Sequence, residues 1–115
     1  MNRTEIEFKG KTIPILFGAW VMGQLIKSGY PLASLHEEMT SNPFIFFPKL
    51  VYLGAVNATP GKDLSAFDEN DFFDWVDEVG GISSEEVMKV INVFTTSLGT
   101  DVGEVKKKQP TKVAK

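Results

Sequence analysis

The chain has 115 residues, the length of one domain, and its hydrophobic fraction of 43% and charged fraction of 23% are those of an ordinary globular protein. It contains no cysteine, which excludes a disulfide framework, a thiolate nucleophile and a cysteine-bound metal. Its net charge of −3 combines an acidic segment at residues 63–86 with a lysine-rich C-terminal end, which argues against a uniformly basic nucleic-acid surface. The N-terminus lacks the apolar region of a signal peptide and no apolar run is long enough to span a bilayer, so we expect a cytoplasmic protein.

The first predicted elements are two short strands. Residues 4–9 alternate polar and apolar side chains, which is the pattern of a half-buried strand. Residues 12–17 repeat the alternation after a turn that we predict at Gly10-Lys11. Pro14 has no amide to donate, so it restricts the second strand to an edge position. These residues together predict an N-terminal β-hairpin.

Three helical segments are predicted next. Apolar residues recur at helical spacing over residues 18–28, and Pro31 then predicts the first turn of a short second helix. Residues 44–58 are apolar nearly all round, which is typical of a helix buried in the core. We place Pro48 in the first turn of that helix, where its missing amide does little harm.

An acidic amphipathic helix is predicted after Asp68, which has the position and chemistry of a helix N-cap. At 100° per residue, four apolar side chains fall on one narrow face. These core-facing residues are Phe72, Trp75, Val76 and Val79. Phe73 lies at the edge of that face, and the acidic Asp74 and Asp77 lie opposite it.

The last predicted helix begins with a capping box formed by Ser83 and Glu86. Its core face consists of Val87, Val90, Ile91, Phe94 and Leu98. We therefore predict one domain over residues 1–99, mainly α-helical with four or five helices and a small N-terminal β-hairpin. Residues 100–115 are rich in lysine and poor in apolar surface, which predicts a flexible tail.

The sequence offers little for catalysis. His36 is the only histidine, and helical spacing places it on the polar side of the short second helix. The acidic residues match neither a calcium loop nor a histidine-based zinc motif, and the glycines form no phosphate-binding loop. We therefore expect no catalytic residue, no metal and no cofactor, and a protein that works by binding another protein.

Five residues are the candidates for that binding. Phe73 is a possible exposed contact at the edge of its helix, and Asp74 and Asp77 suggest an acidic docking face for a basic partner. A purely structural interpretation is also open, because acidic residues near a helix start interact favourably with the helix dipole. Phe46 and Phe47 belong to an aromatic run that either anchors a partner or packs in the core.

The order of these features carries a family resemblance. The hairpin leads into residues 14–18 (PILFG), and the later helices contain residues 47–54 (FPKLVYLG), 71–78 (DFFDWVDE) and 90–98 (VINVFTTSL). In this order, and over residues 4–98, the chain resembles the tail assembly chaperones of long-tailed, siphovirus-type bacteriophages and prophages. The resemblance implies a non-catalytic protein that coats the helical tape-measure protein, keeps it soluble and helps recruit tail-tube subunits.

The lysines at residues 106–108 leave two further interpretations open. Members of this family often exist in two lengths through ribosomal frameshifting, and an adenine-rich run encoding these lysines would be a place for a ribosome to slip. The alternative function is a small regulatory or nucleic-acid-associated domain that uses the same basic tail. A few lysines on an acidic body, however, give only weak, salt-sensitive attraction to phosphates.

Overall fold

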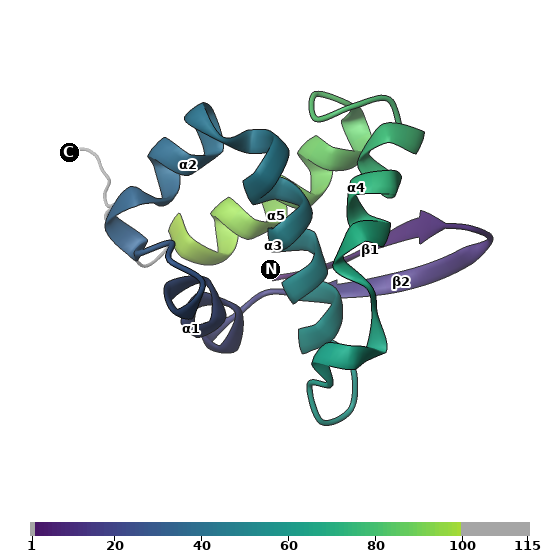
Figure 1. Ribbon diagram of the computed structural model, residues 1–115, viewed down its shortest axis with the longest axis horizontal. Coiled ribbons are helices and arrows are strands. Elements are labelled where there is room, and N and C mark those ends of the chain that lie inside the picture. The colour runs from purple at the N-terminus through teal and green to yellow at the C-terminus, as the bar shows by residue number, and fades with distance from the viewer. Residues whose placement is uncertain (1, 100–115) are drawn as a thin grey trace.

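The computed structural model describes residues 2–99, in which an antiparallel two-stranded hairpin is followed by five α-helices (Figure 1). The elements are β1 (Arg3–Phe8), β2 (Lys11–Leu16), α1 (Ala19–Lys27), α2 (Leu35–Ser41), α3 (Pro43–Asn57), α4 (Glu69–Glu78) and α5 (Glu85–Gly99), with 3₁₀ helices η1 (Leu32–Ser34) before α2 and η2 (Leu64–Ala66) before α4. The predicted fold class, mainly helical with an N-terminal hairpin, is confirmed. The predicted tail, with its lysines at residues 106–108, lies outside the described residues.

The turn of the hairpin lies one residue earlier than predicted. Phe8 pairs with Lys11, so the two turn residues are Lys9 and Gly10 and not Gly10 and Lys11. Both turn residues have positive φ, 52° at Lys9 and 76° at Gly10, as a type I′ turn requires. Glycine suits the second position because it adopts a positive φ without steric cost. The turn type also matches the twist of the two strands.

The register of the hairpin accommodates Pro14. The amide of Phe17 donates to the carbonyl of Asn2 (N···O 2.8 Å), so the even-numbered residues of β1 belong to the hydrogen-bonded pairs. Pro14 lies opposite Glu5, in a pair that makes no hydrogen bond across the two strands. An amide at position 14 would point to the open edge of β2, so the predicted edge position of Pro14 is confirmed.

The inner face of the hairpin packs on α3. Its buried side chains are Ile6, Phe8, Ile13 and Ile15. The two elements approach closely at Gly54, where a Cβ atom would lie 2.6 Å from Cγ2 of Ile15 and 3.0 Å from Cε1 of Phe17. Position 54 therefore has no room for a side chain. Because glycine has none, α3 can lie directly against β2.

α3 is the central helix of the core. It contacts β2, α1, α2, α4 and α5, and most of its side chains are buried. It begins at Pro43, so the prediction that Pro48 marks its first turn is wrong: Pro48 is buried inside the helix. Pro43 occupies a position whose amide needs no partner, whereas Pro48 removes one helical hydrogen bond. Contacts on several sides of α3 offset that loss.

α5 presents the predicted apolar face to the core, with Val87, Val90, Ile91 and Phe94 buried and Leu98 partly buried. Its cap differs from the prediction. The hydroxyl of Ser84 accepts a hydrogen bond from the amide of Val87 (3.2 Å), so Ser84 is the N-cap and the predicted capping box of Ser83 with Glu86 is one residue too early.

Candidate protein-binding surface

α4 has one buried face and one acidic face. Its N-cap is Asp68, whose carboxylate accepts a hydrogen bond from the amide of Asn70 (3.0 Å), as predicted. The buried residues of the helix are Phe72, Trp75 and Val76. Asp74 and Asp77 are both exposed on the other side. The predicted division of this helix into a core face and an acidic face is confirmed.

α3 and α4 lie next to each other and run in opposite directions (Figure 1). An ion pair links them, with Nζ of Lys49 3.4 Å from Oε1 of Glu69. One turn before Lys49 is Ile45, and one turn after Glu69 is Phe73. Because the helices are antiparallel, going back one turn along α3 and going forward one turn along α4 lead to the same end of the helix pair. Ile45 and Phe73 therefore lie at the same level, on either side of the seam between the two helices.

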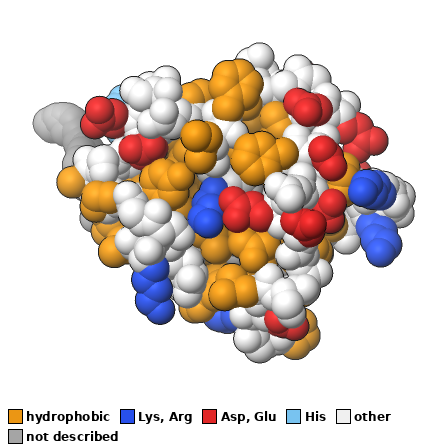
Figure 2. All heavy atoms as spheres, in the orientation of Figure 1, with side chains coloured by type: hydrophobic (Ala, Val, Ile, Leu, Met, Phe, Trp, Pro, Cys, Tyr) orange, Lys and Arg blue, Asp and Glu red, His pale blue; other side chains and the backbone are white. Residues whose placement is uncertain are grey.

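Exposed apolar side chains gather at this level of the seam. Phe44 is 68% exposed, Ile45 57% and Phe73 38%, and the exposed Asp74 and Asp77 follow Phe73 on the outer side of α4. We name these five residues the α3/α4 patch. Figure 2 shows apolar side chains over α3 and α4 on this face of the molecule, with acidic side chains beside them. An apolar centre with a polar rim is typical of a protein-protein contact.

Phe46 and Phe47, which the sequence suggested as binding residues, are not on the surface. Phe46 is 0% exposed and Phe47 7%. The ring of Phe46 packs against Tyr30, with centroids 5.3 Å apart, and against Phe94 at 6.4 Å. A partner cannot reach these two rings while α3 keeps its place in the core. Their assignment as binding residues is therefore wrong, and the alternative of core packing holds.

Phe44 and Ile45 have the exposed position that the sequence suggested for Phe46 and Phe47. Since α3 begins at Pro43, these two residues occupy its first turn and remain largely uncovered. In a helix that is apolar all round, spacing cannot distinguish covered positions from uncovered ones. The one local signal is Pro43 itself, because proline is common at the first helical position and so marks where the exposed turn begins.

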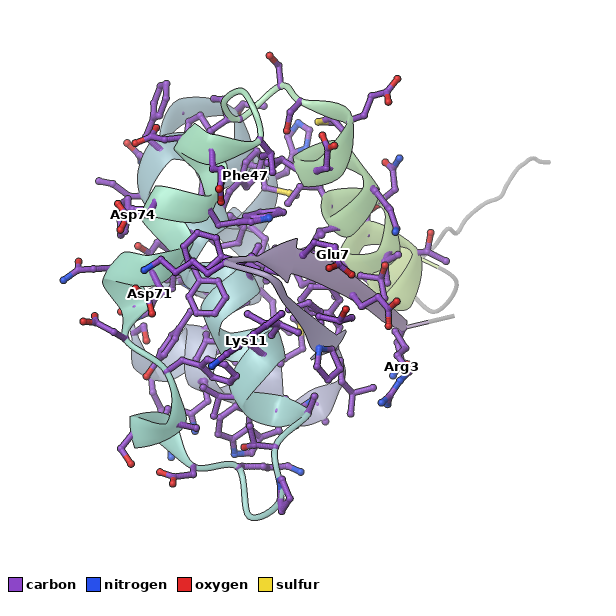
Figure 3. The ribbon with its side chains drawn as sticks, turned by 90° about the vertical axis from the view of Figure 1, so that its right-hand side faces the viewer. Arg3, Glu7, Lys11, Phe47, Asp71 and Asp74 are labelled. Carbon is purple, nitrogen blue, oxygen red and sulfur yellow. The ribbon has the colours of Figure 1, made fainter. Side chains whose placement is uncertain are left out.

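The opposite flank of α4 faces the tip of the hairpin. There, Nζ of Lys9 lies 3.8 Å from Oδ1 of Asp71 and 5.0 Å from the centroid of the Phe8 ring. One cavity of about 360 Å³ extends from Lys9 toward η2, and another of about 340 Å³ extends toward Asp74 and Asp77. Figure 3 shows Asp71 and Asp74 together at the α4 side of the hairpin. The acidic face of α4 is thus accessible both from the seam and from the hairpin tip.

The segment between α3 and α4 is held by two polar groups. The hydroxyl of Tyr52 donates to the carbonyl of Leu64 (2.8 Å), and burial together with the nearby carboxylate of Glu69 raises the pKa of Tyr52. Hydrogen bonds from the hydroxyl and the amide of Ser65 lower the pKa of the Asp63 carboxyl. At neutral pH, Tyr52 is therefore a phenol and Asp63 a carboxylate, each in the state that its hydrogen bonds require.

Other kinds of site have little support in the part of the chain that the structure describes. His36 is exposed, as predicted. Over residues 2–99, no group of three or more histidine or acidic side chains is placed to hold a metal ion. Within the same range, every helix is too short or too polar to cross a membrane.

The comparisons with known proteins leave the family of this chain open. No protein-family model, curated protein or solved structure matches it. The α3/α4 patch and the order of the elements along the sequence are therefore the observations on which a function can be proposed.

Proposed function

We propose that this chain is a tail assembly chaperone of a long-tailed bacteriophage or prophage, a non-catalytic protein that binds the tape-measure protein and helps recruit tail-tube subunits. The order of hairpin and helices, which resembles that of the family, supports the proposal. The single observation that carries it is the exposure of Ile45 and Phe73 on either side of one seam, with the exposed Phe44 next to Ile45 in the sequence and Asp74 and Asp77 following Phe73.

The patch has the composition that a helical client needs. A long amphipathic helix exposes an apolar stripe that promotes aggregation until another surface covers it. Ile45 and Phe73 offer apolar contacts on either side of one seam. Asp74 and Asp77 favour a client with basic residues beside its apolar stripe, because complementary charge speeds the encounter and selects the partner. Such binding keeps a client soluble without any chemical step.

Co-expression with the tape-measure protein of the same phage or prophage tests this function. We expect the tape-measure protein to remain in the soluble fraction with the wild-type chain and to aggregate without it. The double variant Ile45→Ala/Phe73→Ala removes two apolar contacts from the patch, so we expect the soluble fraction to fall close to its level without the chaperone. Both proteins are quantified on gels after centrifugation.

The matched control is Ile26→Ala in α1, which removes the same side chain at a similar exposure, 51% against 57% for Ile45. We expect this variant to keep the client soluble. An equal loss of soluble tape-measure protein with the double variant and with Ile26→Ala would contradict the role of the α3/α4 patch. A tape-measure protein that is equally soluble without this chain would contradict the chaperone function itself.

In the proposed function, the recruitment of tail-tube subunits would need a second binding module in addition to the domain described above. If the codons for residues 106–108 are a slippery sequence, a longer product would share this domain and carry a different C-terminal extension. Tethering the two modules would raise the effective concentration of tube subunits beside the tape-measure protein. Mixed lysine codons without an overlapping reading frame would contradict the longer product and weaken the family assignment.

The alternative, a nucleic-acid-associated domain, depends on lysines outside the described residues. Within those residues, Asp71, Asp74 and Asp77 give α4 a negative surface that repels phosphates. No feature of the described fold favours this alternative over protein binding.

A further inference from the structure

The outer edge of β1 has unused hydrogen-bonding groups. In the register of the hairpin, the even-numbered residues of β1 pair with β2, so the main-chain groups of Arg3, Glu5 and Glu7 point away from it. No turn, loop or side-chain hydrogen bond within residues 2–99 reaches the main chain of these three residues. β1 thus presents a row of free amides and carbonyls to any chain that lies beside it.

The two edges of this small sheet differ. On the outer edge of β2, Pro14 replaces the central outward amide, which is a common way to prevent a further strand from pairing. The corresponding residue on β1 is Glu5, which keeps its amide. Strand addition is therefore blocked on the β2 side. On the β1 side α5 contacts the strand, but within residues 2–99 the outward main-chain groups of β1 remain unpaired.

A groove runs along the open edge. A cavity of about 200 Å³ lies between Glu5 and Glu7 of β1 on one side and Glu86 and Lys89 of α5 on the other. Figure 3 shows β1 at the front of the molecule, with Glu7 on the side toward α5. Val79 and the edge of the buried Trp75 also line the cavity, so its floor is apolar. A strand edge facing a helix across an apolar floor is a suitable place for an extended peptide.

The charges around the groove select its occupant. Glu5 and Glu7 project from the outer face of the sheet, and on the opposite wall the charges of Glu86 and Lys89 offset each other. Three acidic side chains and one basic side chain therefore line the groove, which is acidic overall. A strand added to β1 would place alternate side chains beside Glu5 and Glu7, where cross-strand neighbours of opposite charge are favoured. The side chains between them would point to the inner face, over Val79.

We propose that the outer edge of β1 binds an extended segment of a partner protein in which basic and apolar residues alternate. The main chain of the segment pairs with Glu5 and Glu7 as a third strand. Its basic side chains lie beside those two glutamates, and its apolar side chains enter the groove above Val79 and Trp75. This surface is separate from the α3/α4 patch, so the proposal does not depend on the chaperone function.

A direct test uses the ¹⁵N-labelled full chain and the probe peptide acetyl-Lys-Val-Lys-Val-Lys-amide. We expect saturable binding that slows hydrogen exchange of the Glu5 and Glu7 amides. At a peptide concentration about ten times Kd, exchange should slow about tenfold, because only the free protein exchanges. The peptide acetyl-Glu-Val-Glu-Val-Glu-amide, with the opposite charge, should give no protection.

Two variants at one position separate main-chain pairing from charge. Glu5→Pro removes the outward amide at a position that makes no bond to β2, so the hairpin should keep its fold while peptide affinity falls at least about tenfold. Glu5→Gln keeps the amide and loses the charge, so we expect a smaller loss, about twofold to threefold. If Glu5→Pro does not fold, the same question is answered by N-methylating the probe peptide at the amides that face β1, which should abolish its binding to the wild-type chain.

Several outcomes would overturn the proposal. These are the absence of saturable binding, equal binding by Glu5→Pro, and equal binding of the N-methylated peptide. Protection of Glu5 and Glu7 that grows with protein concentration, without peptide, would assign the edge to a second copy of this chain and would also overturn it.

Discussion

α3 and α4 lie side by side, yet they are held in place in different ways. α3 has ten buried residues out of 15, no side-chain cap and a proline inside it, so local sequence preferences contribute little to its stability. α4 has three buried residues out of 10, an Asp68 cap and acidic side chains in its first turn. α3 depends on the core around it, whereas α4 combines a narrow buried face with strong local signals. A surface that must bind a partner is best placed on the second kind of helix, where outward residues can change at little cost to the fold.

The largest expected effect tests the narrow buried face of α4. Trp75 is 1% exposed and is among the largest fully buried side chains, so Trp75→Ala should lower the free energy of unfolding by about 3 to 5 kcal/mol. Phe73→Ala, two residues away on the exposed side, should cost less than about 1 kcal/mol. Urea denaturation of both variants measures the difference. Equal losses would show that α4 has no surface free for binding.

Gly54→Ala tests how closely α3 depends on its neighbours. Alanine is the better helix former by up to about 1 kcal/mol, but its Cβ would collide with Ile15, so we expect a net destabilisation of about 1 to 3 kcal/mol. The control is Gly23→Ala in α1, where a Cβ meets no atom within 4 Å and the substitution should stabilise the protein. Thermal unfolding of the two variants should shift in opposite directions. A stabilising Gly54→Ala would contradict the close approach of β2 to α3.

The caps of the two helices provide a smaller contrast. Asp68→Ala removes the hydrogen bond to the amide of Asn70 and a charge near the start of α4, and should cost about 1 kcal/mol. Asn42→Ala at the start of α3 removes no cap, since its side chain donates instead to the exposed carboxylate of Glu38, and should change stability by less than about 0.5 kcal/mol. Similar losses from the two substitutions in chemical denaturation would mean that α3 also relies on local capping.

The smallest effect concerns Tyr52, which connects α3 to the segment before α4. Its hydrogen bond to Leu64 lies near the surface, so it should make the wild type more stable than Tyr52→Phe by only about 0.5 kcal/mol at neutral pH. Because burial raises the pKa of Tyr52, folding favours the neutral phenol, and this contribution is complete below the ordinary tyrosine pKa of about 10. It should decrease as the pH rises above that value. Denaturation of both proteins from pH 8 upward, at about one-unit steps, measures the difference; a constant difference would contradict the raised pKa.

The hairpin and α4 could be predicted closely from the sequence because their signals are local. Alternation identified both strands, and the aspartate at position 68 with the spacing of Phe72 and Trp75 identified the helix and its buried face. The turn was placed one residue late because Gly10 suits either of two adjacent turns. Only the pairing of Phe8 with Lys11 distinguishes them.

The starts of α3 and α5 could not be predicted as reliably. Pro43 and Pro48 are both possible first-turn prolines, and Ser83 and Ser84 are both possible caps. Local chemistry hardly distinguishes the members of either pair. The choice depends on which start lets the following apolar residues reach the core, and that is a property of the assembled fold.

The candidate site divides along the same line. Asp74 and Asp77 could be placed on the exposed side of α4, and Phe73 at the edge of its buried face, because the spacing of apolar residues in an amphipathic helix shows which side is buried. Phe46 and Phe47 could not be placed correctly, because α3 is apolar on every side and its sequence does not show which side faces the solvent. Their burial, and the exposure of Ile45, follow from where the other helices and the hairpin cover α3.

The sequence by itself determined the elements, their order and the outward face of α4, since these follow from spacing, caps and turn residues within a few positions of one another. Only the tertiary structure decided which apolar residues of α3 remain exposed, that Ile45 and Phe73 share one seam, and that the edge of β1 stays open while Pro14 blocks that of β2. The physical reason is that exposure and neighbourhood depend on contacts between segments far apart in the chain. No local pattern of side chains encodes which segment will cover another.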